Sequence, residues 1–521
     1  MLAYLVPLVI DTLYSWARMF VALFLSILIA LGIGIYAAIN RKAEKVIIPI
    51  VDILQTLPIL AFFPFVIYII VATIPGYIGI NAAVVFLIIT SMLWNIIFGV
   101  YEAVKTLPNE FMELAALYGM GIREKLSKIL IPASMPKVVE QSMLSWSIGL
   151  FYLVTSEIFS TSNASYAVKH GIGVALTNLA FSGNFAEYAA GIGIFIVFVI
   201  ATREFFFVPF EKYVNRYNQA TGVPIILKAS SRIRKLKVVH RLFQRISTIH
   251  NIVPKHKPHI FHYTASAYTT TAAQKNTKIA NATYIAIFLA IALIIITNST
   301  LAKDEAATLY ALLASFARVW LAFLVIVLVA IPLGVYLIFL TKHTGKYMLI
   351  FQVVAAIPAT ILLPIIVIAV KGLPAGSELT AFIVYFLSGI WYVVFSIMAQ
   401  KPYISQSVFE LKKLFEVKGI KAWKKIYIYA ILPGLITGAV TGIAAEWNAS
   451  IVAEYFTTTA IGSGQVITSV GIGIGKLLDI SLSSGNMTLM LLGLINLTIM
   501  IILVNRFVWK RFYDKVENVY K

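Results

Sequence analysis

Long apolar segments alternate with short polar connections along most of this 521-residue chain, and they constrain its fold more than any other feature. A transmembrane helix needs roughly 20 predominantly apolar residues, because the bilayer core offers no water to backbone groups. Segments of this kind cover residues 14–38, 47–73, 82–104, 138–158, 187–208, 281–298, 310–340, 347–370, 379–399, 434–456 and 487–509. They predict an all-α integral membrane protein with about 11 transmembrane helices. Hydrophobic residues form 60% of the chain, above the roughly 45–50% of soluble domains.

Basic residues gather in alternate connections between these segments, and the net formal charge is +20. One set of connections holds Arg41, Lys42, Lys45, the loops 105–137 and 400–433, the stretch 209–280, Lys342, Lys346 and the C-terminal "WKRFYDK". The other set holds only Lys169, Lys303, Lys371 and Lys476. The positive-inside rule therefore predicts an outside N-terminus and a cytoplasmic C-terminus. Topology accounts for the charge, so we expect no nucleic-acid partner. The chain has no cysteine, which excludes disulfides and thiolate metal sites.

The chain also repeats itself, at an offset close to 300. "SWARMF" at 15–20 matches "SFARVW" at 315–320, and Gly34, Tyr36, Pro58, Pro64 and "GIG" at 171–173 recur at the same offset. At an offset of 297, Glu113, Ile129, Pro136 and Glu157 meet Glu410, Ile426, Pro433 and Glu454. We predict two five-span units, residues 1–210 and 310–521. Residues 211–280 form a basic cytoplasmic linker, and 281–309 an extra transmembrane helix with an outer loop that lets both units run in the same direction.

The connection "ELAALYGMGIREKLSKILIP", residues 113–132, is too polar to span a bilayer. Its pattern predicts a short amphipathic helix across the base of the bundle. Ala115, Ala116 and Gly119 would allow a partner surface to approach closely, and Pro132 would mark the turn back into the membrane. The alternative is an ordinary amphipathic helix at the membrane interface.

The order Glu113, Ala115, Gly119, Ile129 and Pro132 resembles the "EAA" loop of ATP-binding-cassette importer permeases. In that family the loop forms a coupling helix that docks on a cytoplasmic ATPase. The second loop, "ELKKLFEVKGIKAWKKIYIYAILP", is degenerate. It keeps Glu410 and Ile426, while Glu416 replaces the glycine, Tyr429 replaces the proline, and Pro433 matches Pro136. A local alternative uses Gly419 as the glycine.

The ending "EWNASIVAEYF…GSGQVITSVGIGIGK…NRFVWKRFY" is similar to the nitrate, sulfonate and taurine branch of this family. This resemblance implies a non-catalytic, duplicated permease in a prokaryotic plasma membrane. It further implies two copies of a separate ATPase that uses ATP and magnesium, an extracytoplasmic binding protein, and import of a small anion such as nitrate, a sulfonate or bicarbonate. A secondary transporter without docking loops is the main alternative. A membrane-embedded enzyme would need a cluster of catalytic groups, and the sequence presents none.

Several ionisable residues at membrane depth are candidates for the translocation pathway. Glu157 and Glu454 end the fourth span of each unit, either as a gate or anchor or as carboxylates facing water. Glu446, beside Trp447 and Asn448, is deeper; it either lines the pathway or pairs with Arg318 or another cation. Arg18 and Arg318 either attract an anion or snorkel to the interface.

Three further patterns are weaker. "SVGIGIGKLL", ending at Gly475-Lys476 and Leu477, departs from a phosphate-binding loop, so we expect packing glycines instead. The linker stretch 212–280 carries 13 Lys/Arg and no acidic residue, which favours an amphipathic helix on anionic lipid headgroups. His256, His259 and His262 are interrupted by Pro258, and we expect no metal site there.

Overall fold

The computed structural model describes residues 5–56, 58–160, 168–215, 299–341, 343–355, 357–401, 404, 419–458, 465–509 and 511–512. The chain divides into two compact units, one of residues 1–217 with 307–521 and one of residues 218–306. Both predicted five-span segments therefore belong to a single compact unit. The predicted extra helix at 281–298, Glu410, the three histidines and most of the basic linker lie outside the described residues.

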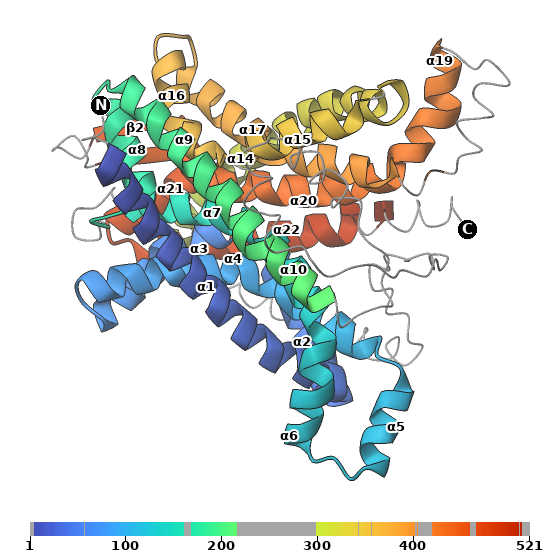
Figure 1. Ribbon diagram of the computed structural model, residues 1–521. Helices are drawn as coiled ribbons and strands as arrows, with labels where there is room; N and C mark the ends of the chain where they lie inside the picture. The colour runs from blue at the N-terminus through green and yellow to red at the C-terminus, as the bar shows by residue number, and fades with distance from the viewer. Residues whose placement is uncertain are drawn as a thin grey trace. The chain divides into compact units, whose positions relative to one another are not determined.

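The first half of the chain is a succession of helices (Figure 1). They are α1 (Leu5–Ile39), α2 (Arg41–Thr56), α3 (Ile59–Thr73), α4 (Tyr77–Lys105), α5 (Asn109–Leu117), α6 (Ile122–Lys125), the π-helical turn η1 (Leu126–Leu130), α7 (Ile131–Ser160), α8 (Ile172–Phe181), α9 (Phe185–Thr202), the π-helical turn η3 (Arg203–Phe207) and α10 (Val208–Asn215).

The second half repeats this order and adds two short strands. Its elements are α14 (Ser299–Val335), η4 (Tyr336–Leu340), α15 (Thr344–Ala355), α16 (Ala359–Val370), α17 (Gly376–Ala399), α19 (Gly419–Ala422), η6 (Trp423–Tyr427), α20 (Ile428–Glu454), β1 (Tyr455–Thr458), β2 (Gln465–Ser469), α21 (Ile474–Ser483), α22 (Met487–Val504) and η7 (Asn505–Trp509).

Seven described helices are long and apolar enough to cross a membrane, and each covers one of the predicted spans. The span expected at 138–158 lies in α7, which is less apolar and is not among the seven. The spans expected at 47–73 and 347–370 are not single helices. Each breaks in front of a proline, Pro58 or Pro358, because proline has no N–H to donate and disfavours helical geometry in the preceding residue. The count of 11 spans stays a prediction.

Two local features differ from the expected structure. After α20 the chain forms an antiparallel hairpin, in which Tyr455 pairs with Ser469 and Thr458 with Gln465. The β-branched and aromatic residues of "YFTT" and "QVITS" favour strands. Residues 299–309, which we expected in an outer loop, are instead the first turns of α14.

Wide helical turns occur at corresponding places in the two halves. The turn η1 corresponds to η6, and the turn η3 corresponds to η7. The first pair joins the short helices α6 and α19 to the long helices α7 and α20. Such π-helical turns are rare and commonly mark functional positions in helices.

Close packing of α1 on α4, and of α14 on α17, depends on a glycine in each half. A Cβ atom built on Gly34 would lie 2.8 Å from the Cβ of Val100 in α4. A Cβ atom built on Gly334 would lie 2.5 Å from Cγ2 of Ile397 in α17. Small residues at such crossings let two helix backbones approach, which is the main source of helix association in lipid.

Substitution at this crossing gives a direct test of the packing. We expect Gly34→Ala to destabilise the folded protein by about 1–3 kcal/mol, because the added methyl group overlaps Val100. Gly32→Ala, two residues away in the same helix, is the matched control: nothing lies within 4 Å of its Cβ position. There we expect a gain of about 0.5–1 kcal/mol from the better helix former. Thermal unfolding in nanodiscs measures both, and equal behaviour of the two variants would contradict the packing.

Candidate functional site

The predicted coupling segment is a helical hairpin formed by α5 and α6, which extends away from the long helices in Figure 1. Within α5, Ala115 is buried while Glu113 and Ala116 are exposed. Gly119 ends the helix in the left-handed region, with φ +61°. The N–H of Met120 donates to the Ala115 carbonyl at 2.9 Å, and the N–H of Gly119 to that of Ala116 at 3.0 Å. These two bonds form a Schellman motif, in which glycine is the least strained residue.

Gly119 therefore has a different role from the one expected. Nothing of the described chain lies within 4 Å of a Cβ atom placed on it, so it makes no close packing contact within the protein. It stops α5 and reverses the chain toward α6. That reversal leaves large apolar side chains on the surface, namely Phe111, Leu114, Leu117, Tyr118 and Ile122, with Leu117 82% and Tyr118 77% exposed. A cluster of exposed apolar residues on a polar loop indicates a contact surface for a partner.

The segment continues into α7 without a break at Pro132. Residues from Ile122 to Ser160 are helical throughout, and η1 supplies the wide turn before the proline. The expectation that Pro132 turns the chain is therefore wrong. The proline also does not determine the wide turn, since η6 is followed by Tyr429 at the matching position. Next to this turn the Lys128 ammonium donates to Glu124 of α6 at 2.9 Å, and this hydrogen bond lowers the pKa of Glu124.

The second coupling loop is described only from Gly419 onward, so the expected role of Glu410 stays a prediction. Gly419 adopts the same left-handed conformation as Gly119, with φ +60°. Ile426 belongs to η6 as Ile129 belongs to η1, at matching positions. Pro433 lies within α20, as Pro136 lies within α7.

Glu157, near the end of α7, is fully buried in an ion-pair cluster. Arg18 of α1 donates to its carboxylate at 2.6 Å, and so does the Ser15 hydroxyl at 2.6 Å. The backbone N–H of Gly173, at the start of α8, donates to the other oxygen at 2.9 Å. The Arg18 guanidinium also donates to the Asn81 side-chain oxygen at 2.8 Å and to the His170 carbonyl at 2.7 Å. One buried carboxylate thus joins the interior of α1 to the end of α7 and the start of α8.

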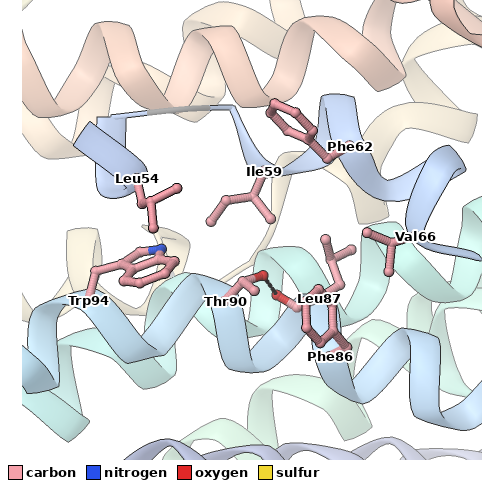
Figure 2. Close-up of a pocket in the computed structure, with 8 residues that line it drawn as sticks. All are labelled: Leu54, Ile59, Phe62, Val66, Phe86, Leu87, Thr90 and Trp94. Atoms are coloured by element: carbon pink, nitrogen blue, oxygen red, sulfur yellow. Dashed lines mark hydrogen bonds between the residues drawn. The ribbon is translucent and has the colours of Figure 1, made fainter. Parts of the chain in front are cut away.

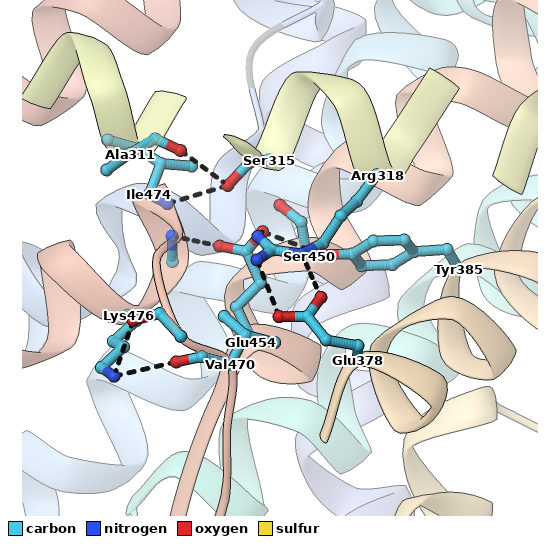
Figure 3. A network of polar contacts seen from close by, with 12 residues as sticks. Ala311, Ser315, Arg318, Glu378, Tyr385, Ser450, Glu454, Val470, Ile474 and Lys476 are labelled. Carbon is cyan, nitrogen blue, oxygen red and sulfur yellow. Dashed lines mark hydrogen bonds and ion pairs between the residues drawn. The ribbon is translucent and has the colours of Figure 1, made fainter. Parts of the chain in front are cut away.

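Glu454, at the end of α20, occupies the matching cluster of the second half (Figure 3). The N–H of Gly475 donates to its carboxylate at 2.8 Å, and the Tyr385 hydroxyl at 3.0 Å. Arg318 lies 3.4 Å from Glu454 and makes a bidentate contact with Glu378 at 2.5 and 2.9 Å. Where the first half has Asn81, the second half therefore has a second carboxylate.

Glycines are required where the chain passes over these carboxylates. A Cβ on Gly171 would lie 2.5 Å from the Glu157 carboxyl carbon, and one on Gly473 would lie 2.6 Å from the Glu454 carboxyl carbon. Gly171 thus corresponds to Gly473, so pairing "GIG" at 171–173 with that at 471–473 was wrong by two positions. The stretch "SVGIGIGKLL" does not form a phosphate-binding loop. The N–H of Gly475 donates to Glu454, and the Lys476 ammonium donates to the Val470 carbonyl at 2.8 Å.

The structure separates the three neighbouring candidates Glu446, Trp447 and Asn448. Glu446 is fully buried against Gly389 of α17 in its own half. The expected pair with Arg318 does not form, because Arg318 is bound to Glu378 and Glu454. Trp447 is buried in the core. Asn448 lies between the halves, where its side-chain oxygen accepts from the N–H of Leu60 in α3 at 3.5 Å.

Contacts between the two halves follow one pattern. The helix α3 packs on α20 and α21, and α16 packs on α7 and α8. At the second of these contacts the Tyr188 hydroxyl of α9 donates to the Ile361 carbonyl of α16 at 2.5 Å. The broken helices α2–α3 and α15–α16 thus bring each half against the other.

A cavity of about 150 Å³ lies between α3 and α4 in the first half (Figure 2). It is lined by Leu54, Ile59, Phe62, Val66, Phe86, Leu87, Thr90 and Trp94. The Thr90 hydroxyl donates to the Leu87 carbonyl at 2.8 Å, which leaves an almost wholly apolar lining. This cavity has no charge with which to bind an anion. Among the described residues no group of three or more His, Cys, Asp or Glu could hold a metal ion.

Comparison with known proteins agrees with these features. The long apolar helices define a multi-pass membrane protein. Residues 30–212 match the family described as the binding-protein-dependent transport system inner membrane component.

Individual relatives are distant. The glycine betaine/proline betaine transport system permease ProW of Escherichia coli is 25% identical over 37% of this chain and 51% of its own. The nitrate import permease NrtB of Synechocystis is 26% identical over 37% and 65%. The bicarbonate transport system permease CmpB of Synechococcus elongatus is 21% identical over 28% and 51%. The chain thus spans about half to two thirds of the length of these relatives.

The buried ion pair of the first half predicts a large mutational effect. We expect Glu157→Gln to destabilise the protein by about 3–5 kcal/mol, because it leaves the Arg18 guanidinium buried without a counter-charge. Replacing Glu124 by Gln, on the exposed face of α6, is the control and should leave stability nearly unchanged, because an exposed ion pair contributes little. Thermal unfolding in nanodiscs measures both. A Glu157→Gln protein as stable as the control would contradict a structural role for the pair.

Proposed function

We propose that this chain is the transmembrane permease subunit of an ATP-binding-cassette importer, with both halves of the translocation pathway in one polypeptide. The observation that carries the proposal is the α5–α6 hairpin, which presents exposed apolar side chains beside Glu113. A helical hairpin with such a surface fits an apolar groove on a partner. The matched clusters around Glu157 and Glu454, and the matched turns η1 and η6, support a tandem duplication of the permease unit.

Two copies of a cytoplasmic ATPase would bind the two coupling loops, and an extracytoplasmic binding protein would deliver the substrate. ATP and magnesium act in the partner, and this chain binds neither. The N-terminus is outside and the C-terminus cytoplasmic, as the distribution of basic residues predicts. When the ATPase dimer closes, the loops move together and the halves alternate between inward- and outward-facing states. Glu157 and Glu454 then act as anchors of the helix ends rather than as groups that contact substrate.

The substrate we propose is a small anion. Its support is the relatives named for nitrate and bicarbonate, together with one named for aliphatic sulfonates. The relatives named for glycine betaine favour a second candidate, a zwitterionic betaine. Neither Arg18 nor Arg318 is free to hold an anion, since both contact carboxylates. Selectivity therefore falls mainly to the binding protein.

Docking can be tested by copurification. The chain is purified from its native membranes in mild detergent, and associated proteins are identified by mass spectrometry. We expect an ATPase of the ATP-binding-cassette type at about two copies per chain. Leu117→Asp or Glu113→Arg should lower its recovery at least tenfold, because each disrupts the exposed face of α5. Ile78→Asp is the matched control. Ile78 is 72% exposed, but it lies at the N-terminal end of α4, whereas the α5–α6 hairpin follows the C-terminal end of that helix.

Two outcomes would overturn the importer. One is that no such ATPase copurifies even after cross-linking, in which case the chain should be tested alone in liposomes as a secondary transporter. The other is equal ATPase loss in Leu117→Asp and Ile78→Asp. With the ATPase and binding protein reconstituted, uptake of labelled nitrate, bicarbonate, an alkanesulfonate and glycine betaine separates the substrate candidates.

A further inference from the structure

A stripe of glycines on α20 brings it unusually close to α17. Gly434, Gly438 and Gly442 recur every four residues and therefore share one face of the helix. A Cβ on Gly434 would lie 2.9 Å from the Ile397 Cα, and one on Gly438 would lie 2.7 Å from the Val393 Cα. The backbones of the two helices are in direct contact along this stripe, which leaves no space for water.

Glu446 is the next residue of the same stripe. It is fully buried, and neither carboxylate oxygen has a hydrogen-bond partner within the described chain. It fits only because the facing residue is Gly389: a Cβ there would lie 2.7 Å from the Glu446 Oε1 and 2.7 Å from Cδ1 of Ile326 in α14. A carboxyl group thus fills a space between α14, α17 and α20.

Two ionisable residues of these helices, Arg318 and Tyr385, are engaged elsewhere. Arg318 of α14 contacts Glu378 and Glu454. Tyr385 of α17, one turn from Gly389, donates its hydroxyl to Glu454. Neither Glu446 oxygen therefore has a charged side chain of the described residues as a hydrogen-bond partner. An ionised carboxylate in such a place would lack both solvation and a counter-ion, which costs several kcal/mol.

The first half shows what the position requires. At the matching place α7 has Gly149, and a Cβ there would overlap Cε of Met92 in α4. Met92 is itself the match of Gly389, at the offset that aligns Gly149 with Glu446. One half therefore fills the space with a methionine of α4 against a glycine of α7. The other half fills it with a glutamate of α20 against a glycine of α17, so the helix that supplies the large side chain and the helix that supplies the glycine are exchanged. In both halves a side chain of about methionine's size lies against a glycine of the neighbouring helix.

We propose that Glu446 is a proton-binding site of the second half: its carboxyl group is protonated when α17 and α20 are in contact. The bound proton makes the Glu446 side chain uncharged, as the Met92 side chain always is. The comparison of the halves rests on the internal repeat proposed above. Release of the proton would place a charge in a seam without water, so loss of the proton and separation of α17 from α20 are linked.

Isotope-edited infrared spectroscopy of the full chain in nanodiscs, with ¹³C-labelled glutamate, tests the protonation directly. At neutral pH the wild type should show a protonated-carboxyl band that is lost in Glu446→Gln. Glu378→Gln is the control and should keep that band, because Glu378 is partly exposed and bound to Arg318. If Glu446→Gln instead removes ionised-carboxylate intensity, the proposal is wrong.

A second measurement follows the linkage between protonation and folding. A carboxyl group that holds its proton when folded and loses it when unfolded makes the protein less stable as pH rises through the neutral range. The unfolding constant of the wild type, relative to Glu446→Gln, should rise by up to about tenfold per pH unit. A ratio that does not change with pH would contradict the proton site.

Exchanging the residues at positions 446 and 389 tests whether Glu446 is needed for its proton or only for the space that it fills. Glu446→Gly should be destabilised by the cavity, and adding Gly389→Met, the arrangement of the first half, should restore stability and abolish the pH dependence. A double variant no more stable than Glu446→Gly would overturn the reciprocal packing. None of these measurements uses an ATPase or a transport assay, so their failure would leave the proposed importer function untouched.

Discussion

A carboxylate buried in a membrane protein needs partners on all sides, and the need of Glu157 and Glu454 for partners organises both halves of this molecule. Each receives an arginine from the first long helix and a backbone N–H from the start of a short helix, whose positive end favours the negative charge. Because lipid offers little driving force for apolar helices to associate, these clusters join α1 to the end of α7 and the start of α8, and α14 to the end of α20 and the start of α21.

The long helices α7 and α20 continue at their other ends into η1 and η6, which follow the short helices α6 and α19. From Ile122 to Ser160 the chain is helical without interruption, so α6 and the Glu157 cluster lie on one continuous helical segment. Only η1 departs from the regular pattern, close to the loop. A displacement of the loop by a partner would then tilt α7 about its anchored end, and the halves meet along this helix and its counterpart α20.

The sequence predicts where the helices of this arrangement lie better than it predicts which residues contact each other across them. Apolar runs locate seven long helices, and Pro58 and Pro358 give a visible reason for the two that break. Arg18, in contrast, was expected either to attract an anion or to snorkel to the interface, yet it is only 5% exposed. Its partner Glu157 is distant in the chain, and helix periodicity carries no information on contacts between distant helices. The signal that could have joined them was the recurrence of both residues in the second half.

Asymmetry between the halves carries the remaining argument. Asn81 and Glu378 occupy matching places, as do Gly149 and Glu446, and in each case the second half has an additional carboxylate. One of these is neutralised by Arg318, while the other lies in an apolar seam. Among the described residues the second half therefore has one more buried carboxyl group than the first, that of Glu446, while Glu378 is partly exposed and bound to Arg318.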